Sequence, residues 1–116
     1  MKRKLSLALI ALLGPITSAL AQGDACQRQC TSTYGNACFQ SCLTRHVGEL
    51  GRCRVLCSFL DGTCQGACEE PDACFRKCKY DVIPCYVACD DPQNQACHDA
   101  CSTSQTLCID RCIHPR

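Results

Sequence analysis

Cysteine is the most frequent apolar residue of this chain, and the cysteines come in pairs whose members are four residues apart. The pairs lie at 26/30, 38/42, 53/57, 64/68, 74/78, 85/89, 97/101 and 108/112. All 16 cysteines belong to such a C-x-x-x-C pair, so no odd thiol is expected. Positions i and i+4 lie on one face of an α-helix. Each pair therefore predicts a short helix that carries two sulfurs on one stripe.

The spacers between consecutive pairs have a rhythm. When the pairs are taken two at a time, the inner spacers have 7, 6, 6 and 6 residues, and the outer spacers have 10, 5 and 7. The inner spacers contain residues typical of turns, at 34–36, 61–62 and 83–84, and the outer ones have acidic-proline sequences, at 69–72 and 90–92. Asp24 and Asp72 each stand two residues before the first cysteine of a pair, where they would suit a helix N-cap. The rhythm predicts four repeated units, at about residues 24–44, 51–69, 72–90 and 95–114.

We interpret each unit as an antiparallel pair of helices. The predicted fold is all-α, an array of four short disulfide-stapled antiparallel helical hairpins. Helices of about two or three turns do not persist alone, but two nested disulfides per unit would hold each pair at about 10 Å, the upper end of ordinary helix packing. The main alternative joins neighbouring units, for example Cys42 with Cys53. The predicted nested pairs are Cys26–Cys42, Cys30–Cys38, Cys53–Cys68, Cys57–Cys64, Cys74–Cys89, Cys78–Cys85, Cys97–Cys112 and Cys101–Cys108.

Residues 1–21 have the features of a secretory signal peptide. Lys2, Arg3 and Lys4 precede an apolar run at 5–13, and residues 19–21 fit the small-x-small pattern of a cleavage site. The remaining domain, residues 22–116, keeps all 16 cysteines, about one residue in six, which is typical of a disulfide scaffold. We therefore expect a secreted, extracellular protein. Because thiols oxidise in the secretory pathway, we expect disulfides at these positions and no metal or cofactor.

The other apolar residues are too few to fold this domain alone. Leu, Ile, Val and Phe together number 15 between residues 22 and 116, whereas ordering such a chain costs on the order of 100 kcal/mol. Disulfides add roughly 2 to 4 kcal/mol each by constraining the unfolded chain. The bridges therefore decide whether the domain folds.

The charge of the domain excludes several classes of partner. Without the signal peptide, the domain has nine basic and 11 acidic residues. This slightly negative net charge disfavours nucleic-acid binding and a lytic action on membranes. No second apolar stretch reaches the roughly 18 residues of a membrane span, so no membrane insertion is expected. We expect a monomer.

Two groups of residues are candidates for a functional site. His98-Asp99 in front of Cys101 resembles the His-Asp pair of secreted phospholipase A2, but the glycine-rich calcium loop of that family is missing, and we expect no enzymatic activity and no catalytic residue. The second candidate is a basic and aromatic group that could bind a protein partner, because Arg and aromatic side chains are favoured anchors. Its members are Arg76, Lys77, Lys79, Tyr80 and Tyr86.

The twin C-x-x-x-C spacing over residues 26–112 resembles that of the alpha-hairpinins. These are plant peptides that act as protease inhibitors, antimicrobials or ribosome inactivators, and some scorpion toxins share their scaffold. The small mitochondrial intermembrane-space chaperones use the same twin motif, and the overall form is similar to small cysteine-rich effectors secreted by fungi and oomycetes. These resemblances imply a stapled helical scaffold and say almost nothing about activity.

From these patterns we expect an effector-like or toxin-like protein that binds an extracellular or host protein of another organism. The first alternative is a defence protein, either a protease inhibitor or an antimicrobial. The second alternative is a passive structural protein.

Overall fold

The computed structural model describes residues 24–115, which contain helices and no strand. Residues 24–30 are helical and continue into the π-helix η1 (Thr31–Ala37) and then into α2 (Cys38–Arg45). The other elements are α3 (Leu50–Glu69), α4 (Ala73–Asp81), α5 (Ile83–Cys89) and α6 (Gln95–Ile113). The predicted signal peptide at 1–21 lies outside the described residues. None of the helices between residues 24 and 115 combines the length and apolarity that a membrane span requires.

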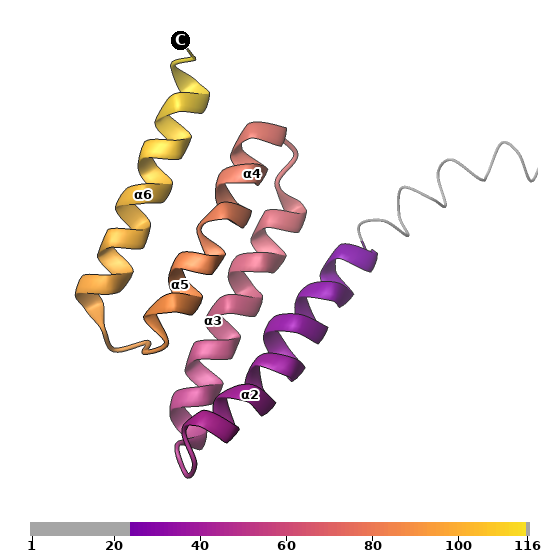
Figure 1. The fold of residues 1–116 in the computed structure, drawn as a ribbon. Helices are drawn as coiled ribbons and strands as arrows, with labels where there is room; N and C mark the ends of the chain where they lie inside the picture. The colour runs from indigo at the N-terminus through magenta and orange to yellow at the C-terminus, as the bar shows by residue number, and fades with distance from the viewer. Residues whose placement is uncertain (1–23, 116) are drawn as a thin grey trace, which may run out of the picture.

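The helices form four arms that lie side by side (Figure 1). The first arm is residues 24–45, the second is α3, the third is α4 with α5, and the fourth is α6. The two helices of the third arm share the α-helical residue Val82 and run in one direction, although Pro84 lacks the N–H group that would continue the hydrogen-bond ladder. The second arm packs against the first and third arms, and the fourth packs against the third.

Eight disulfides join these arms in two nested sets of four. The Cα atoms of every bridged pair are 5.6 to 5.9 Å apart, within the usual range for a disulfide. The first and second arms therefore form one long antiparallel hairpin, and the third and fourth arms form another. The first hairpin has Cys26–Cys68, Cys30–Cys64, Cys38–Cys57 and Cys42–Cys53. The second has Cys74–Cys112, Cys78–Cys108, Cys85–Cys101 and Cys89–Cys97.

The cysteine spacing explains why each arm runs in one direction along its whole length. In the last three arms the four cysteines follow each other at intervals of 4, 7 and 4 residues. At 3.6 residues per turn these positions fall within about 60° of one another around the helix axis. A straight helix thus presents all four sulfurs in one row, and two such helices placed antiparallel can close four bridges at once.

The first arm departs from this spacing and from α-helical geometry at the same place. Its inner cysteines, Cys30 and Cys38, are eight residues apart instead of seven. One extra residue would turn the second pair of sulfurs about 100° away from the first pair. The π-helix η1 spans the seven residues between them, and its i→i+5 hydrogen bonding absorbs an additional residue. The π-helix therefore keeps the four sulfurs of this arm facing α3.

The all-α fold of disulfide-stapled helices is confirmed, but the predicted pairing of the cysteines is wrong. None of the eight bridges expected within the units at 24–44, 51–69, 72–90 and 95–114 is formed, and Cys42–Cys53, the expected alternative, is present. The unit boundaries nearly match the four arms, but each unit is one arm that runs in a single direction instead of a hairpin. The inner spacers of the last three arms do not reverse the chain, because their length keeps the cysteines in phase, and in the first arm the π-helix η1 restores that phase. The pairs Cys26–Cys42, Cys30–Cys38, Cys53–Cys68, Cys57–Cys64, Cys74–Cys89, Cys78–Cys85, Cys97–Cys112 and Cys101–Cys108 are replaced by bridges between arms.

The core between the arms consists mainly of half-cystines. Only six of the 13 buried apolar residues are not cysteine: Leu56, Leu60, Ala67, Val82, Ile83 and Tyr86. Because the buried side chains are this few, the bridges form much of the packing surface between the arms as well as the covalent links.

The ends of the arms have identifiable caps. Asp72 caps α4 as expected, because its side chain accepts a hydrogen bond from the Phe75 N–H at 3.0 Å. Asp24 instead lies within the helical residues of the first arm and pairs with Arg28.

Two turn residues between 24 and 115 have a positive φ, Gly48 at 83° between the first two arms and Asp90 at 53° after α5. They mark the places where the chain leaves a helix.

Candidate functional site

The predicted basic group is engaged at the link between the two hairpins. The Arg76 guanidinium donates hydrogen bonds to the backbone carbonyls of Glu70 at 2.8 Å and Pro71 at 3.0 Å. The Lys79 ammonium lies 2.6 Å from the Glu70 carboxylate. The hydrogen bond from Lys79 lowers the pKa of Glu70, and the Asp72 N–H contributes in the same direction. Arg76 and Lys79 thus hold residues 70–72 in place.

The remaining members of this group do not gather on one surface. Lys77 forms an exposed ion pair with Asp81 at 2.6 Å, one helical turn away. The Tyr80 ring is half-buried, with its hydroxyl against the sulfur of Cys26. Tyr86 is only 6% exposed, and its hydroxyl lies 2.9 Å from the Ser102 hydroxyl. The expectation that Tyr86 extends a binding surface is therefore wrong, because this ring packs into the core.

The His98-Asp99 string forms no catalytic pair among the described residues. The His98 ring packs with Phe59 and Tyr86, at centroid distances of 5.4 and 5.2 Å. Its Nε2 donates to the Asp91 carbonyl at 3.1 Å. The Asp99 carboxylate accepts a hydrogen bond from Gln95 at 2.7 Å. His98 therefore serves as packing and as a link to the turn that precedes α6.

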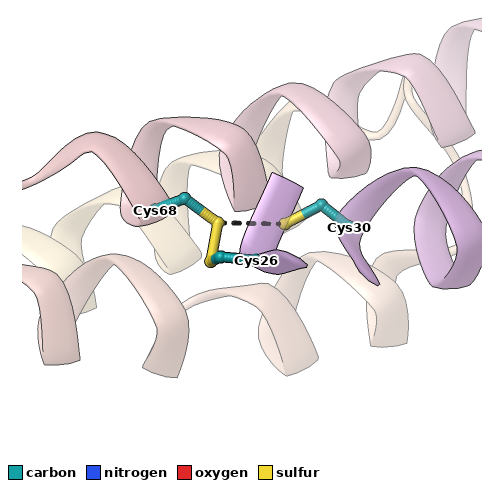
Figure 2. Close-up of side chains that lie close together, drawn as sticks. All are labelled: Cys26, Cys30 and Cys68. Atoms are coloured by element: carbon teal, nitrogen blue, oxygen red, sulfur yellow. Dashed lines mark hydrogen bonds between the residues drawn. A yellow bond between two sulfur atoms is a disulfide. The ribbon is translucent and has the colours of Figure 1, made fainter. Parts of the chain in front are cut away.

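Two groups of three sulfurs lie as close together as metal ligands would. They are Cys26, Cys30 and Cys68, and Cys89, Cys97 and Cys101. Figure 2 shows the first group, in which the sulfurs of Cys30 and Cys68 are 3.5 Å apart. All of these sulfurs belong to disulfides, and residues 24–115 contain no free cysteine. The short distances come from neighbouring bridges that stack, and disulfide sulfurs offer no thiolate to a metal ion.

The structure contains a groove that the sequence patterns did not reveal. It has a volume of about 240 Å³ and lies between the first arm, α3 and α5. Its base is formed by Leu56 and Leu60, each 2% exposed. Tyr34, Ala37 and Ser41 line one side and Val87, which is 45% exposed, the other. A mainly apolar hollow with a few polar groups at its edges is typical of a binding site.

One end of this groove is closed by ion pairs between the two hairpins. Asp90 accepts hydrogen bonds from Arg45 at 2.7 Å and from His46 Nε2 at 2.9 Å, and its backbone carbonyl accepts one from Arg52 at 2.8 Å. The other ring nitrogen of His46 lies 3.3 Å from Glu49. Burial raises the pKa of Asp90, but the hydrogen bonds from His46 and Arg45 outweigh burial and lower it overall. We call Arg45, His46, Glu49, Arg52 and Asp90 the junction cluster.

Comparison with known proteins adds no assignment. No protein family, no curated protein and no solved structure matches this chain. The groove and the junction cluster are therefore interpreted from their own chemistry. Sequence reasoning missed both because they depend on which arms are neighbours. The available signal was the pair Leu56 and Leu60, which are four residues apart and adjoin the cysteine row of α3.

Proposed function

We propose that this protein is a secreted, non-enzymatic binding protein of the effector or toxin type. In this proposal it acts outside the cell on a protein of another organism. The observation that carries the proposal is the combination of eight disulfides with an apolar groove. Stapled arms restrict the local unfolding that proteases require, which suits a protein that acts in a protease-rich space.

The groove is the proposed contact surface. The first arm and α3 are joined by four bridges, and the hydrogen bonds of Asp90 tie the end of α5 to them, so little conformational freedom would be lost on binding. Tyr34 offers an aromatic anchor, and buried leucines form the base. The Arg45–Asp90 ion pair at one end supplies charged groups for orientation. An apolar side chain of a partner protein, next to a polar group that reaches this ion pair, would complement these features.

A binding role fits the groove better than a catalytic one. The side chains along it that carry polar groups are Thr33, Tyr34, Ser41, and the paired Arg45 and Asp90. His98, the one histidine considered for catalysis, packs with Phe59 and Tyr86 instead. A nucleophile with an adjacent base, which covalent catalysis needs, is not assembled by the residues that line the groove.

The test is binding of the purified, oxidised protein to intact cells of organisms that live in contact with its source. Ser41 and Ser104 are both exposed helical serines, but only Ser41 lines the groove. We expect saturable binding that is lost when the cells are treated with protease. Ser41→Arg should weaken it at least about tenfold, because a charged side chain then fills an apolar hollow, whereas Ser104→Arg should leave it unchanged.

The same assay separates the alternatives. Inhibition of purified proteases or of microbial growth, without binding to foreign cells, would favour a defence protein. Retention on the surface of the producing cells alone would favour a structural protein. Equal binding by the Ser41→Arg and Ser104→Arg variants would remove the groove from the proposal.

A further inference from the structure

The disulfide Cys26–Cys68 closes the open end of the first hairpin, and a phenol hydroxyl lies against it. The Tyr80 hydroxyl is 2.8 Å from the Cys26 sulfur and 3.4 Å from the Cys68 sulfur. Because a disulfide sulfur carries no hydrogen, Tyr80 must be the donor. The third arm thus aims an O–H group at a bridge between the first and second arms, and mainly at the sulfur of Cys26.

Exposure limits which bridges an external thiol can reach. The next bridge inward, Cys30–Cys64, is buried, with the two residues 1% and 5% exposed. Its Cys30 sulfur lies beside the Cys68 sulfur, at 3.5 Å (Figure 2). Three bridges have both residues at least partly exposed: Cys26–Cys68, Cys74–Cys112 and Cys89–Cys97.

The second hairpin provides a natural control for Cys26–Cys68. Cys74–Cys112 occupies the same outermost position in its own hairpin. Cys74 is exposed, whereas Cys26 and Cys68 are both half-buried. Among the described residues, no hydroxyl donates a hydrogen bond to either sulfur of Cys74–Cys112. Exposure alone would therefore make Cys74–Cys112 the more reactive bridge.

Thiol–disulfide exchange depends on the leaving sulfur. Exchange is faster when the departing thiolate is more stable, and a hydrogen bond to the charged form stabilises it. The Tyr80 hydroxyl is positioned to donate to Cys26 as that sulfur departs. The hydrogen bond from Tyr80 therefore favours exchange at Cys26–Cys68 over exchange at the more exposed Cys74–Cys112.

We propose that Cys26–Cys68 is the exchange-reactive disulfide of this chain, with a dithiol as its reaction partner. A thiolate of the dithiol attacks Cys68 Sγ and forms a mixed disulfide, while the bond between Cys68 and Cys26 breaks. Cys26 departs as a thiolate that accepts the Tyr80 hydrogen bond and then takes a proton from water. The second thiol of the dithiol loses its proton to water and attacks the dithiol sulfur of the mixed disulfide. The bond to Cys68 breaks, and Cys68 leaves as a thiolate that takes a proton from water. The dithiol is oxidised by two electrons, and the protein disulfide is reduced.

The test is partial reduction of the whole oxidised protein with dithiothreitol. Samples are quenched with acid at intervals, free thiols are alkylated, and labelled cysteines are identified by mass spectrometry. We expect Cys26 and Cys68 to be labelled before the cysteines of the other two accessible bridges, Cys74–Cys112 and Cys89–Cys97. Tyr80→Phe should slow labelling of Cys26 and Cys68 about fivefold, the effect of one hydrogen bond, and leave labelling of Cys74 and Cys112 unchanged.

The Tyr80→Phe variant keeps the ring and removes only the hydroxyl, so it separates hydrogen-bond donation from shielding. Tyr80→Ala is the companion variant, because loss of the ring opens the bridge to solvent. If Tyr80 acts only as a cover, Tyr80→Phe has no effect and Tyr80→Ala speeds the reaction. That result, or earlier labelling of Cys74 and Cys112 in the unaltered protein, would overturn the proposal. Circular dichroism of each oxidised variant verifies that the helices are intact.

Discussion

At the scale of single residues, the turn between the first two arms depends on one glycine. Gly48 has φ of 83°, a conformation that side chains with a Cβ rarely adopt, and no atom lies near the position that its Cβ would occupy. We expect Gly48→Ala to destabilise the protein by about 1 kcal/mol through backbone strain alone. Gly51→Ala is the matched control, because its Cβ also meets open space but its φ is not positive. Guanidinium unfolding midpoints measure both variants, and equal midpoints would contradict the strain argument.

Asp90 provides a pH-dependent contribution to stability. Burial raises its pKa, but the hydrogen bonds from His46 and Arg45 prevail and hold its pKa below the ordinary value of 3.8. A carboxyl group with a lowered pKa stabilises the fold at pH values above its unfolded pKa, and this contribution is lost as the pH falls toward the folded pKa. Asp90→Asn should therefore cost about 0.5 to 1 kcal/mol at pH 6 and much less at pH 2.

Denaturant titrations of Asp90→Asn at the two pH values measure this difference. The exposed Asp99→Asn on α6 serves as the control substitution. A deficit that is the same at pH 2 and pH 6 would show that Asp90 acts through packing instead of charge.

At the scale of elements, the sequence indicated the ends of the arms better than how the helices pair. The predicted unit at 51–69 matches α3 (Leu50–Glu69), and the unit at 95–114 matches α6 (Gln95–Ile113). Gly62 and Ile83-Pro84 looked like turns, yet a helix tolerates a glycine at a cost of about 1 kcal/mol and a proline near the start of a helix. The spacing of 4, 7 and 4 residues held the decisive information, because it keeps four sulfurs in phase.

The π-helix gives this phase argument a direct test. Deleting Asn36, an exposed residue of η1 (Thr31–Ala37), shortens the interval between Cys30 and Cys38 to the seven residues of the other arms. We expect an uninterrupted α-helix, the same four bridges and no loss of stability. Deleting Ser104 in α6 is the opposite case, because it shortens an interval that is already in phase. That variant should give mispaired disulfides on oxidative refolding, and disulfide mapping distinguishes the outcomes.

At the scale of the whole molecule, the bridges replace a conventional core. Only six buried apolar residues other than cysteine lie between the arms, and arms of this length are only marginally helical in isolation. Full reduction should therefore abolish most of the helical circular-dichroism signal and expose the chain to proteolysis. A reduced protein that stays helical would show that side-chain packing contributes more than we infer.

The groove could not be predicted because it is a property of the assembled arms. Tyr34, Leu56 and Val87 lie far apart in the sequence and meet only when α3 packs between the first and third arms. Arg76 and Lys79, by contrast, were predicted as binding residues because they are close in sequence, and they stabilise the link between the hairpins. Local sequence patterns identified the stapled helices, while the groove depended on the pairing of the cysteines.

The central claim is that the first and second arms are joined covalently by four bridges. The chain contains three glutamates, Glu49, Glu69 and Glu70, and Glu49 stands in the exposed turn between these arms. A glutamate-specific protease, applied to the oxidised protein, cuts after Glu49 and at the end of α3. Mass spectrometry without reduction should then find the peptide that ends at Glu49 linked to residues 50–69, with the residues of the second hairpin as a separate species. Reduction should split the linked species in two. Separate masses for the peptide ending at Glu49 and for residues 50–69 before reduction would mean that each arm is closed on itself, and would contradict the two-hairpin fold.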